Sequence, residues 1–231
     1  MDPVPAADEL AEIPLFEGLS GEDLTRIAEL LHRKVFRAGT LLMTAEQPGE
    51  AIYVILAGSL KVYLVREDGN EVILAILGPG QTVGEMSLLD SAGRSANAMT
   101  MESTTLLWMA RAAFRRCLQT APALSYNLLR LLCQRLRTVN EQILALTSLD
   151  VAGRVARQIL ALADQYGQAD GAGGVYIPLR LTQGDLAAIV GTSREGVNRV
   201  MVRLKERAIL SVSGKHHITV HQRGRLAALC R

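Results

Sequence analysis

The sequence predicts an α+β protein with a β-rich N-terminal part, a long helix and a C-terminal helical part. Short runs rich in Val, Ile, Leu and Tyr alternate with glycines over residues 34–107, which is typical of antiparallel strands. Apolar residues then recur at helical spacing up to Leu149, and two short helices joined by a glycine turn follow. We expect the domains to span residues 1–110, 111–149 and 150–231.

Composition limits the class of protein. The chain of 231 residues is long enough for two packed cores, and no apolar run reaches the roughly 20 residues that a membrane span needs. The start, Met1–Pro5, lacks the basic and apolar regions of a signal peptide. Cys117, Cys133 and Cys230 are scattered, which argues against a disulfide framework and a C-x-x-C metal site. We expect a cytoplasmic protein with no membrane partner.

The charge is unevenly distributed along the chain. Residues 1–150 carry 13 Lys and Arg against 18 Asp and Glu, a net charge of −5. Residues 151–231 carry 12 against 5, a net charge of +7. A basic C-terminal part beside an acidic remainder favours a module that binds a polyanion, although a solvated surface would give the same excess.

The N-terminal part predicts one helix followed by a compact β-barrel or roll. Ser20 can cap the helix, with Asp23 reaching back to it. Glu67-Asp68-Gly69-Asn70 has the composition of a hairpin turn. Strands are expected at Ala51–Leu56, Ser59–Val65 and Val72–Leu77.

The long helical segment carries an apolar seam. It starts near Arg111, and Pro122 is expected to interrupt it. Gaps of 3, 4, 3, 4 and 3 separate the seam residues Leu129, Leu132, Leu136, Val139, Ile143 and Leu146. This heptad spacing favours a two-stranded coiled coil, and therefore a C₂ homodimer, over an amphipathic helix that lies on its own domain.

The segment Val83–Ala96 places an acid, a cation and a hydroxyl close together. The planar fork of Arg94 can hold two phosphate oxygens. Ser95 and the backbone N–H groups near Ala96 can donate to the same anion. Glu85 would be repelled by phosphate, so its expected target is a hydroxyl such as a ribose 2′-OH. Together these groups predict a cyclic-nucleotide site.

The C-terminal part contains a predicted helix-turn-helix. Thr182 starts a capping motif for a helix over Asp185–Val190. Gly191 can take the positive φ of a tight turn, and Ser193 is a suitable N-cap for a helix over Arg194–Arg207. The second helix of such a motif enters the major groove of DNA.

The second helix carries the residues expected to contact bases. Arginine is suited to guanine O6 and N7, and glutamate can accept from cytosine N4, so Arg194, Glu195 and Arg199 are the candidates. The alternative is that they are surface charges, with Glu195 paired to Arg199 one turn away. The buried side is expected to be Val197, Val200, Met201 and Leu204.

Two motifs carry a family resemblance that runs from about Leu15 to about Val220. The pattern G-E-x8-R-S-A at Gly84–Ala96, followed by T-S-R-E-G-V-N-R at Thr192–Arg199, resembles the cyclic-AMP receptor protein (CRP/FNR) family of bacterial regulators. The resemblance implies an N-terminal jelly-roll-like cyclic-nucleotide-binding β-barrel, a long dimerisation helix and a C-terminal winged helix-turn-helix. The wing would be Ser211–Val220, turning at Gly214-Lys215.

The resemblance also implies site residues and a DNA sequence. Retention of the three base-reading residues implies palindromic sites with TGTGA-like half-sites. The DNA contacts would be Thr182, Ser193, Arg194, Glu195 and Arg199. The cyclic nucleotide would contact Gly84, Glu85, Met86, Arg94, Ser95, Ala96, Arg135, Val139 and Asn140.

The ligand is expected to be cyclic AMP, with cyclic GMP possible and no prosthetic group. The chain departs from the family pattern at Val139-Asn140, where the cyclic-AMP receptor has Thr-Ser. Asn140 can still donate to and accept from adenine, whereas Val139 can only pack. An iron–sulfur branch is disfavoured because no cysteine precedes Cys117, and a haem branch because His32 is the only histidine before residue 216.

The predicted function is a homodimeric transcription regulator, controlled allosterically by a cyclic nucleotide. The alternative is a ligand-independent regulator of the same family that keeps the barrel as a scaffold. No nucleophile–base pair is present, so we expect no enzyme. His216, His217 and His221 are expected at the wing surface rather than at a metal. Family analogy adds a contact with RNA polymerase, for which the loop Gln168–Gly174 is the candidate surface.

Overall fold

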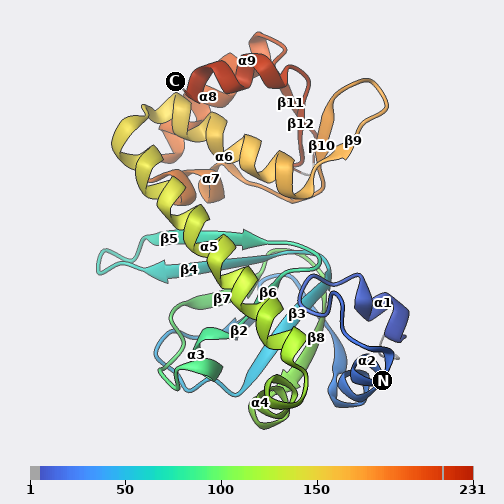
Figure 1. Cartoon of the computed structure of the whole chain (residues 1–231). Coiled ribbons are helices and arrows are strands. Elements are labelled where there is room, and N and C mark those ends of the chain that lie inside the picture. The colour runs from blue at the N-terminus through green and yellow to red at the C-terminus, as the bar shows by residue number, and fades with distance from the viewer. Residues whose placement is uncertain (1–5, 215, 231) are drawn as a thin grey trace. The chain divides into compact units, whose positions relative to one another are not determined.

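The computed structural model describes residues 6–214 and 216–230, which form two compact units (Figure 1). One unit comprises residues 1–64 and 74–136, and the other comprises residues 65–73 and 137–231. The chain start at Met1–Pro5 and Lys215 of the predicted wing turn lie outside the described residues. Within the described part, no helix combines the length and apolar character that a membrane crossing requires.

The β-rich part consists of two four-stranded antiparallel sheets. The first has the order β1-β8-β3-β6 and the second the order β2-β7-β4-β5. The predicted strands correspond to β3, β4 and β5, so the α+β class and the β-barrel are confirmed. The strands are β1 (His32–Phe36), β2 (Leu41–Met43), β3 (Ala51–Ala57), β4 (Leu60–Val65), β5 (Glu71–Leu77), β6 (Thr82–Val83), β7 (Asn97–Thr100) and β8 (Thr104–Ala110).

The barrel interior is filled by side chains that alternate along the strands, as the period of two requires. The buried members are Met43, Ile55, Leu60, Leu77, Val83, Ala98 and Leu106. The predicted hairpin turn also forms: Gly69 has φ +79°, and the Arg66 N–H donates to the carbonyl of Asn70 at 2.9 Å.

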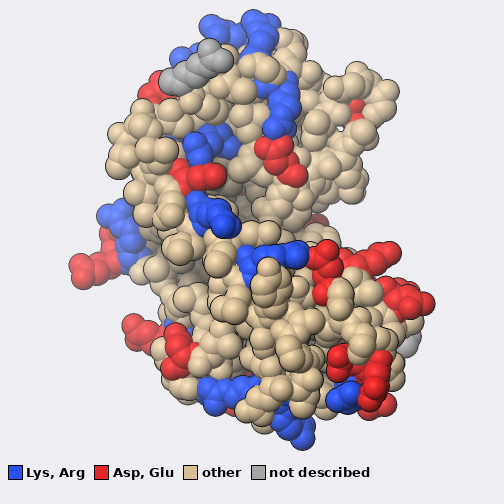
Figure 2. Space-filling view, viewed as in Figure 1, with Lys and Arg blue, Asp and Glu red and all other residues tan. Residues whose placement is uncertain are grey.

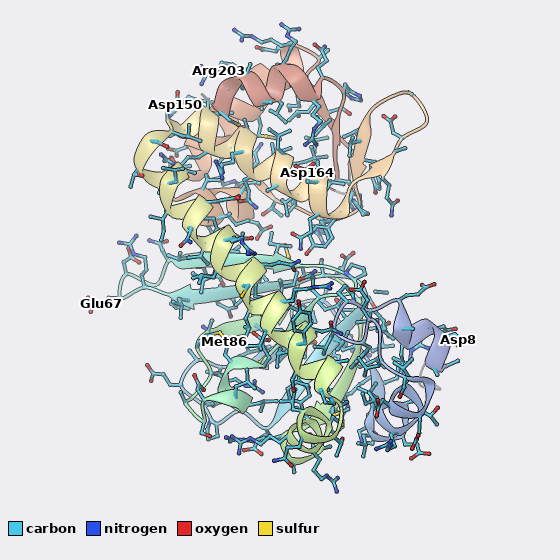
Figure 3. The ribbon with its side chains drawn as sticks, in the orientation of Figure 1. Asp8, Glu67, Met86, Asp150, Asp164 and Arg203 are labelled. Carbon is cyan, nitrogen blue, oxygen red and sulfur yellow. The ribbon has the colours of Figure 1, made fainter. Side chains whose placement is uncertain are left out.

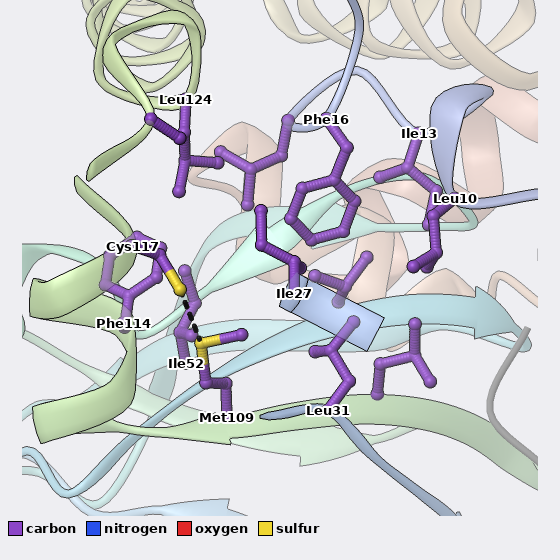
Figure 4. Close-up of a cluster of buried hydrophobic side chains, with 14 of the residues drawn as sticks. Leu10, Ile13, Phe16, Ile27, Leu31, Ile52, Met109, Phe114, Cys117 and Leu124 are labelled. Atoms are coloured by element: carbon purple, nitrogen blue, oxygen red, sulfur yellow. Dashed lines mark hydrogen bonds between the residues drawn. The ribbon is translucent and has the colours of Figure 1, made fainter. Parts of the chain in front are cut away.

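A second core lies between the barrel and the N-terminal helices α1 (Ala7–Ala11) and α2 (Gly21–Leu30), together with α4 (Arg111–Thr120) (Figure 4). Ser20 caps α2 by accepting from the Asp23 N–H, as predicted. Cys117 is buried beside Met109, with their sulfur atoms 4.0 Å apart. Burial raises the pKa of the Cys117 thiol, which is consistent with a packing role.

The long helix α5 (Pro122–Ser148) begins at Pro122, the predicted interruption, and Ala121 separates it from α4. Proline is well tolerated at a first helical position because the N–H it lacks would have no helical partner. The first turns are anchored in the core by Leu124, Leu128 and Leu131. Beyond them the seam is uncovered in the single chain, with Leu132 half-buried. The exposed seam side chains are Leu129 (61%), Leu136 (63%), Val139 (46%), Ile143 (56%) and Leu146 (52%).

The second unit contains α6 (Val151–Tyr166), and Asp150, labelled in Figure 3, precedes its first residue. Asp150 caps α6 by accepting from the Gly153 N–H at 2.8 Å. The helix-turn-helix follows as α7 (Gln183–Val190) and α8 (Arg194–Glu206). The chain then forms the wing strands and ends in α9 (Arg223–Ala227) and a short 3₁₀ turn (Ala228–Cys230).

The wing belongs to a four-stranded antiparallel sheet with the order β11-β12-β10-β9. Its strands are β9 (Gln168–Ala169), β10 (Val175–Ile177), β11 (Leu210–Val212) and β12 (Ile218–Val220). The prediction of an irregular loop over Gln168–Gly174 is therefore wrong at its start. Composition indicates only turn-forming residues there, whereas Gln168 and Ala169 pair with Tyr176 and Val175 of β10 in a short hairpin.

Candidate functional site

The predicted nucleotide-binding segment connects strand β6 to strand β7. After β6 come Gly84, Glu85 and the short helix α3 (Met86–Leu89), and a loop then returns through Arg94 to β7. Glu85 is 2% exposed and Arg94 is 7% exposed. Charged residues are rarely buried to this extent unless they are paired, so their partners determine what the site can do.

Arg94 donates to three acceptors of the protein. Its Nη1 donates to the carbonyl of Gly84 at 2.7 Å and to the hydroxyl of Ser87 at 3.0 Å. Its Nη2 donates to the carbonyl of Ala51 at 2.6 Å. Burial is the largest influence on this guanidinium and lowers its pKa, while Tyr53 and nearby acids oppose the shift. Because arginine stays protonated in proteins, the segment holds a fixed buried cation.

Two glycines leave the space that this guanidinium occupies. Gly84 has φ +93°, and a Cβ there would lie 2.5 Å from Nη1 of Arg94. A Cβ on Gly49 would lie 2.2 Å from the Ser87 hydroxyl and 3.3 Å from Cζ of Arg94. Real Cβ atoms do not approach so closely, so a side chain at either glycine would displace the arginine or the serine.

Glu85 forms an ion pair with an arginine of the long helix. Its Oε1 accepts from Nη1 of Arg135 at 2.5 Å, and Nη2 of Arg135 donates to the carbonyl of Thr82. The other carboxylate oxygen, Oε2, is buried and has no hydrogen-bond partner, and the same is true of the Thr82 hydroxyl. A buried acceptor without a donor is costly, and a ligand hydroxyl would satisfy it.

Glu85 and Arg94 both line a recess of about 70 Å³. Glu85, Arg94, Ser95 and Ala96 are among its lining residues. This space fits a few water molecules or one phosphate-sized group. The donor set of the recess, a guanidinium with an adjacent hydroxyl, fits the phosphate of a nucleotide, and the unpartnered Oε2 fits its sugar hydroxyl.

The other predicted ligand residues differ in their surroundings. Ser95 is exposed, and its hydroxyl contacts Sδ of Met86 at 3.7 Å. Ala96 is buried directly before β7. Val139 and Asn140 are exposed on α5 and belong to the second unit. Their contact with a nucleotide stays a prediction.

The helix-turn-helix has the capping chemistry that the sequence predicts. Thr182 and Asp185 form a complete capping box at the start of α7. Gly191 follows α7 in the left-handed conformation, with φ +65°. Ser193 caps α8 by accepting from the Gly196 N–H at 3.1 Å. In this arrangement the Thr182 hydroxyl is already engaged, since it donates to Asp185 at 2.6 Å.

Helix α8 presents one polar face and one apolar face. The expected apolar residues Val197, Val200, Met201 and Leu204 are all buried. Arg194, Glu195 and Arg199 are exposed. Among the described residues no ion pair joins Glu195 to Arg199. Contact of these three side chains with DNA bases stays a prediction.

The unevenness of charge is visible on the surface. Acidic side chains gather over α1 and α2, and basic side chains gather over α8 and α9 (Figure 2). Two of the wing histidines have local side-chain partners. The ring of His217 packs on Tyr176 with a centroid distance of 5.6 Å, and His221 Nε2 is 2.8 Å from the Ser211 hydroxyl. The described residues contain no cluster of ligands suited to a metal ion.

Several supporting residues were missed from the sequence. Ser87 and Ala51 accept hydrogen bonds from Arg94, and Gly49 leaves room for Ser87 and Arg94. Only the small size of Ser87 between apolar neighbours signals a special role in the sequence. Gln183 donates to Asn198 at 3.0 Å and so links α7 to α8. Neither residue of this bond belongs to a periodic pattern, so the sequence carries no signal for it.

Two known domain families match the two parts of the chain. Residues 33–121 match the cyclic nucleotide-binding domain, and residues 153–229 match the Crp-like helix-turn-helix domain. These ranges contain the buried Glu85 and Arg94 and the two helices of the DNA-binding motif.

Similar proteins span nearly the whole chain. The CRP-like cAMP-activated global transcriptional regulator of Mycobacterium tuberculosis is 33% identical over 222 residues, covering 96% of this chain and 98% of that protein. The cyclic AMP receptor protein of Thermus thermophilus is 34% identical over 197 residues, covering 85% of this chain and 88% of that protein. The structure of FixK2 from Bradyrhizobium japonicum, at 21% identity, shares the fold with a TM-score of 0.78 over 87% of this chain and 98% of that one.

Proposed function

Because the chain belongs to the CRP/FNR family of DNA-binding transcription regulators, we propose that it is a cytoplasmic homodimer whose DNA binding is controlled by cyclic AMP, with cyclic GMP as the second candidate. Members of this family are regulators and not enzymes, as the sequence predicts. The proposal gives residues 1–110 to effector binding, 111–149 to dimerisation and 150–231 to DNA.

The proposal of a cyclic-nucleotide effector rests on the two buried charged residues Glu85 and Arg94. Arg94 supplies a fixed cation, and Ser95 a hydroxyl, at one recess. Glu85 supplies a buried oxygen that lacks a donor. A cyclic nucleotide combines a phosphate monoanion with a ribose 2′-OH, so it would satisfy both. The remaining predicted contacts, Gly84, Met86, Ala96, Arg135, Val139 and Asn140, would pack around the sugar and base.

Arg135 links this site to the dimer helix. It pairs with Glu85 and also donates to the carbonyl of Thr82, so a hydroxyl bound at Glu85 changes the balance of contacts on α5. Two conformations of the dimer that differ in this pairing would place the recognition helices differently, and the ligand would favour one of them. Coupling of this kind is typically worth about 1–3 kcal/mol, a 5–150-fold change in DNA affinity.

The exposed seam on α5 supports the dimer. Leu136 and Ile143 are more than half exposed in the single chain, and apolar residues at heptad spacing pack against a second helix of the same kind. A two-fold dimer would space the recognition helices by one DNA turn, about 34 Å, to contact TGTGA-like half-sites. RNA polymerase is the further partner that the family implies.

Operator binding measured with and without saturating cyclic AMP or cyclic GMP tests the proposal. We expect a 5–150-fold increase in affinity with one of the two nucleotides. An affinity that neither nucleotide changes would favour the second candidate function, a ligand-independent regulator. The observation in favour of that candidate is that Arg94 already has three protein acceptors, together with the Val139-Asn140 departure from the family pattern.

Replacing Arg94 tests the effector site directly. Arg94→Lys keeps the cation but loses the planar fork, so calorimetry should show cyclic AMP bound about tenfold or more weakly. Arg26→Lys is the matched control, because Arg26 is exposed on α2 and, among the described residues, its ion pairs are with Glu22 and Asp23 of its own helix. Unchanged nucleotide affinity in Arg94→Lys would contradict the assignment of this residue to the phosphate.

Replacing Arg199 tests base recognition. Arg199→Ala should lose about 1–3 kcal/mol on the operator and discriminate less at one base pair, with other sequences little affected. Arg203→Ala removes a neighbouring exposed arginine of α8 and serves as the control. Binding measured on a panel of single-base operator variants checks this. Equal weakening on every sequence would make Arg199 a phosphate contact.

A further inference from the structure

We propose that Ser91, Arg111 and Arg115 form a second anion site, which takes a phosphate group and is separate from the proposed cyclic-nucleotide recess. Two guanidinium groups of α4 converge on one oxygen: Nη2 of Arg111 and Nη2 of Arg115 each lie 2.9 Å from the hydroxyl of Ser91. This site goes beyond the proposed function, because neither arginine lines the recess at Arg94.

The charges at this place are not balanced by the protein. Arg111 and Arg115 are one helical turn apart on α4, a spacing at which like charges repel. Among the described residues, neither arginine forms an ion pair with a carboxylate. The adjacent acid Asp90 turns its Oδ1 to the backbone N–H of Ala92 at 3.0 Å instead. The shared acceptor is therefore a neutral hydroxyl where the electrostatics favour an anion.

The position of Arg111 at the start of α4 also favours a bound anion. Arg111 is the first residue of α4, and the first turn of this helix contains no acid and no side-chain cap. Helix N-termini carry partial positive charge, so a cation there is unfavourable and an anion favourable. Two cations beside the start of α4 would both be stabilised by one bound phosphate.

The geometry is fixed on the protein side. Nε of Arg115 donates to the carbonyl of Leu88 at 2.9 Å, which orients its guanidinium toward the loop. Ser91 is exposed, so a group at its hydroxyl is accessible from solvent. Arginine pairs recognise phosphate oxygens through parallel N–H donors, and the hydroxyl supplies one more donor.

The phosphate can come from two sources with the same chemistry. It can be a free phosphate, or it can be carried on Ser91 itself. In the second case the Ser91 Oγ forms a bond to the terminal phosphorus of a nucleoside triphosphate in a protein kinase. The bond from that phosphorus to the bridging oxygen breaks, and a nucleoside diphosphate and the hydroxyl proton leave.

The first arm of the test titrates the full-length protein with inorganic phosphate by calorimetry, in chloride of matched ionic strength. For a free-phosphate site we expect binding that weakens about tenfold or more in Arg111→Ala and in Arg115→Ala. Arg116→Ala is the matched control, because Arg116 is exposed on the same helix. In the Arg94→Lys background, where the recess itself is altered, phosphate binding that still depends on Arg111 and Arg115 belongs to this site, whatever the fate of the cyclic-nucleotide proposal.

The second arm introduces phosphoserine at position 91 during synthesis and measures the thermal unfolding midpoint through Trp108 fluorescence. For a covalent source we expect a higher midpoint with phosphoserine than with serine, and no such increase in the Arg111→Ala, Arg115→Ala double variant. A response in either arm that depends on both arginines supports the site and identifies the source. The proposal is overturned if neither arm responds, or if Arg116→Ala abolishes the response equally.

Discussion

Arg94 illustrates how a single residue is positioned by contacts that are distant in sequence. It is held by the carbonyl of Ala51, 43 residues away, and by the hydroxyl of Ser87. Gly49 and Gly84 leave the room that the guanidinium needs. The ability of this arginine to bind a phosphate therefore depends on residues that would not themselves contact the ligand.

Ser87→Ala should weaken this positioning. The variant removes one acceptor from a charged donor, so we expect a loss of about 1–2 kcal/mol in the free energy of unfolding of the N-terminal unit. Urea unfolding followed by Trp108 fluorescence measures it, with the exposed Ser103→Ala as control. Affinity for cyclic AMP should fall while affinity for adenosine, which lacks phosphate, stays the same. An equal fall for both ligands would mean that Ser87 supports the fold only.

Local signals define the helix-turn-helix at the level of secondary structure. Each helix carries its own cap, at Thr182 and at Ser193. The turn between them depends on Gly191, whose φ of +65° is unfavourable for a residue with a side chain. The recognition helix is therefore oriented by a backbone conformation as well as by its buried face.

Gly191→Ala should lower the free energy of unfolding of the C-terminal unit by about 1–2 kcal/mol, because the Cβ of alanine makes the left-handed conformation unfavourable. Gly184→Ala is the control, because it makes the same substitution within α7. A Cβ there would lie 3.5 Å from the Thr182 hydroxyl oxygen, an ordinary van der Waals distance. Since alanine is a better helix former than glycine, this control should gain up to about 1 kcal/mol. Thermal unfolding of both variants, followed by circular dichroism, compares them. Equal shifts of the same sign would contradict the role given to Gly191.

The whole molecule is expected to be complete only as a dimer. The seam on α5 leaves five apolar side chains half exposed or nearly so, and such surfaces mark interaction sites. The same helix contributes Arg135 to the proposed effector site. Dimerisation and effector binding would thus involve one helix, and Val139 belongs to both predicted sets of contacts, which is the physical basis for coupling between them.

Leu136→Glu should dissociate the dimer, because it places a charge in the middle of the apolar seam. Leu144→Glu is the matched control: Leu144 is 59% exposed on α5, and it lies outside the heptad positions of the seam. Sedimentation velocity should show a monomer for the first variant and a dimer for the second. A dimer that survives Leu136→Glu would move the interface away from this helix.

The sequence by itself determined the elements and their caps. The periods of hydrophobic residues and the positions of Ser20, Pro122, Thr182, Gly191 and Ser193 are local signals, so the corresponding helices and turns were predictable. The pattern around Glu85 and Arg94 likewise predicted the nucleotide-binding segment, because its residues are close in the chain.

Only the tertiary structure decided which partners these residues have. The carbonyl that holds Arg94, the pairing of Glu85 with Arg135 and the strand formed at Gln168–Ala169 all join segments that are separate in sequence or depend on a neighbouring strand. Such contacts produce no periodic pattern in the sequence, because many other side chains or carbonyls could have been the hydrogen-bond partner. Their choice follows from how the sheets and helices pack.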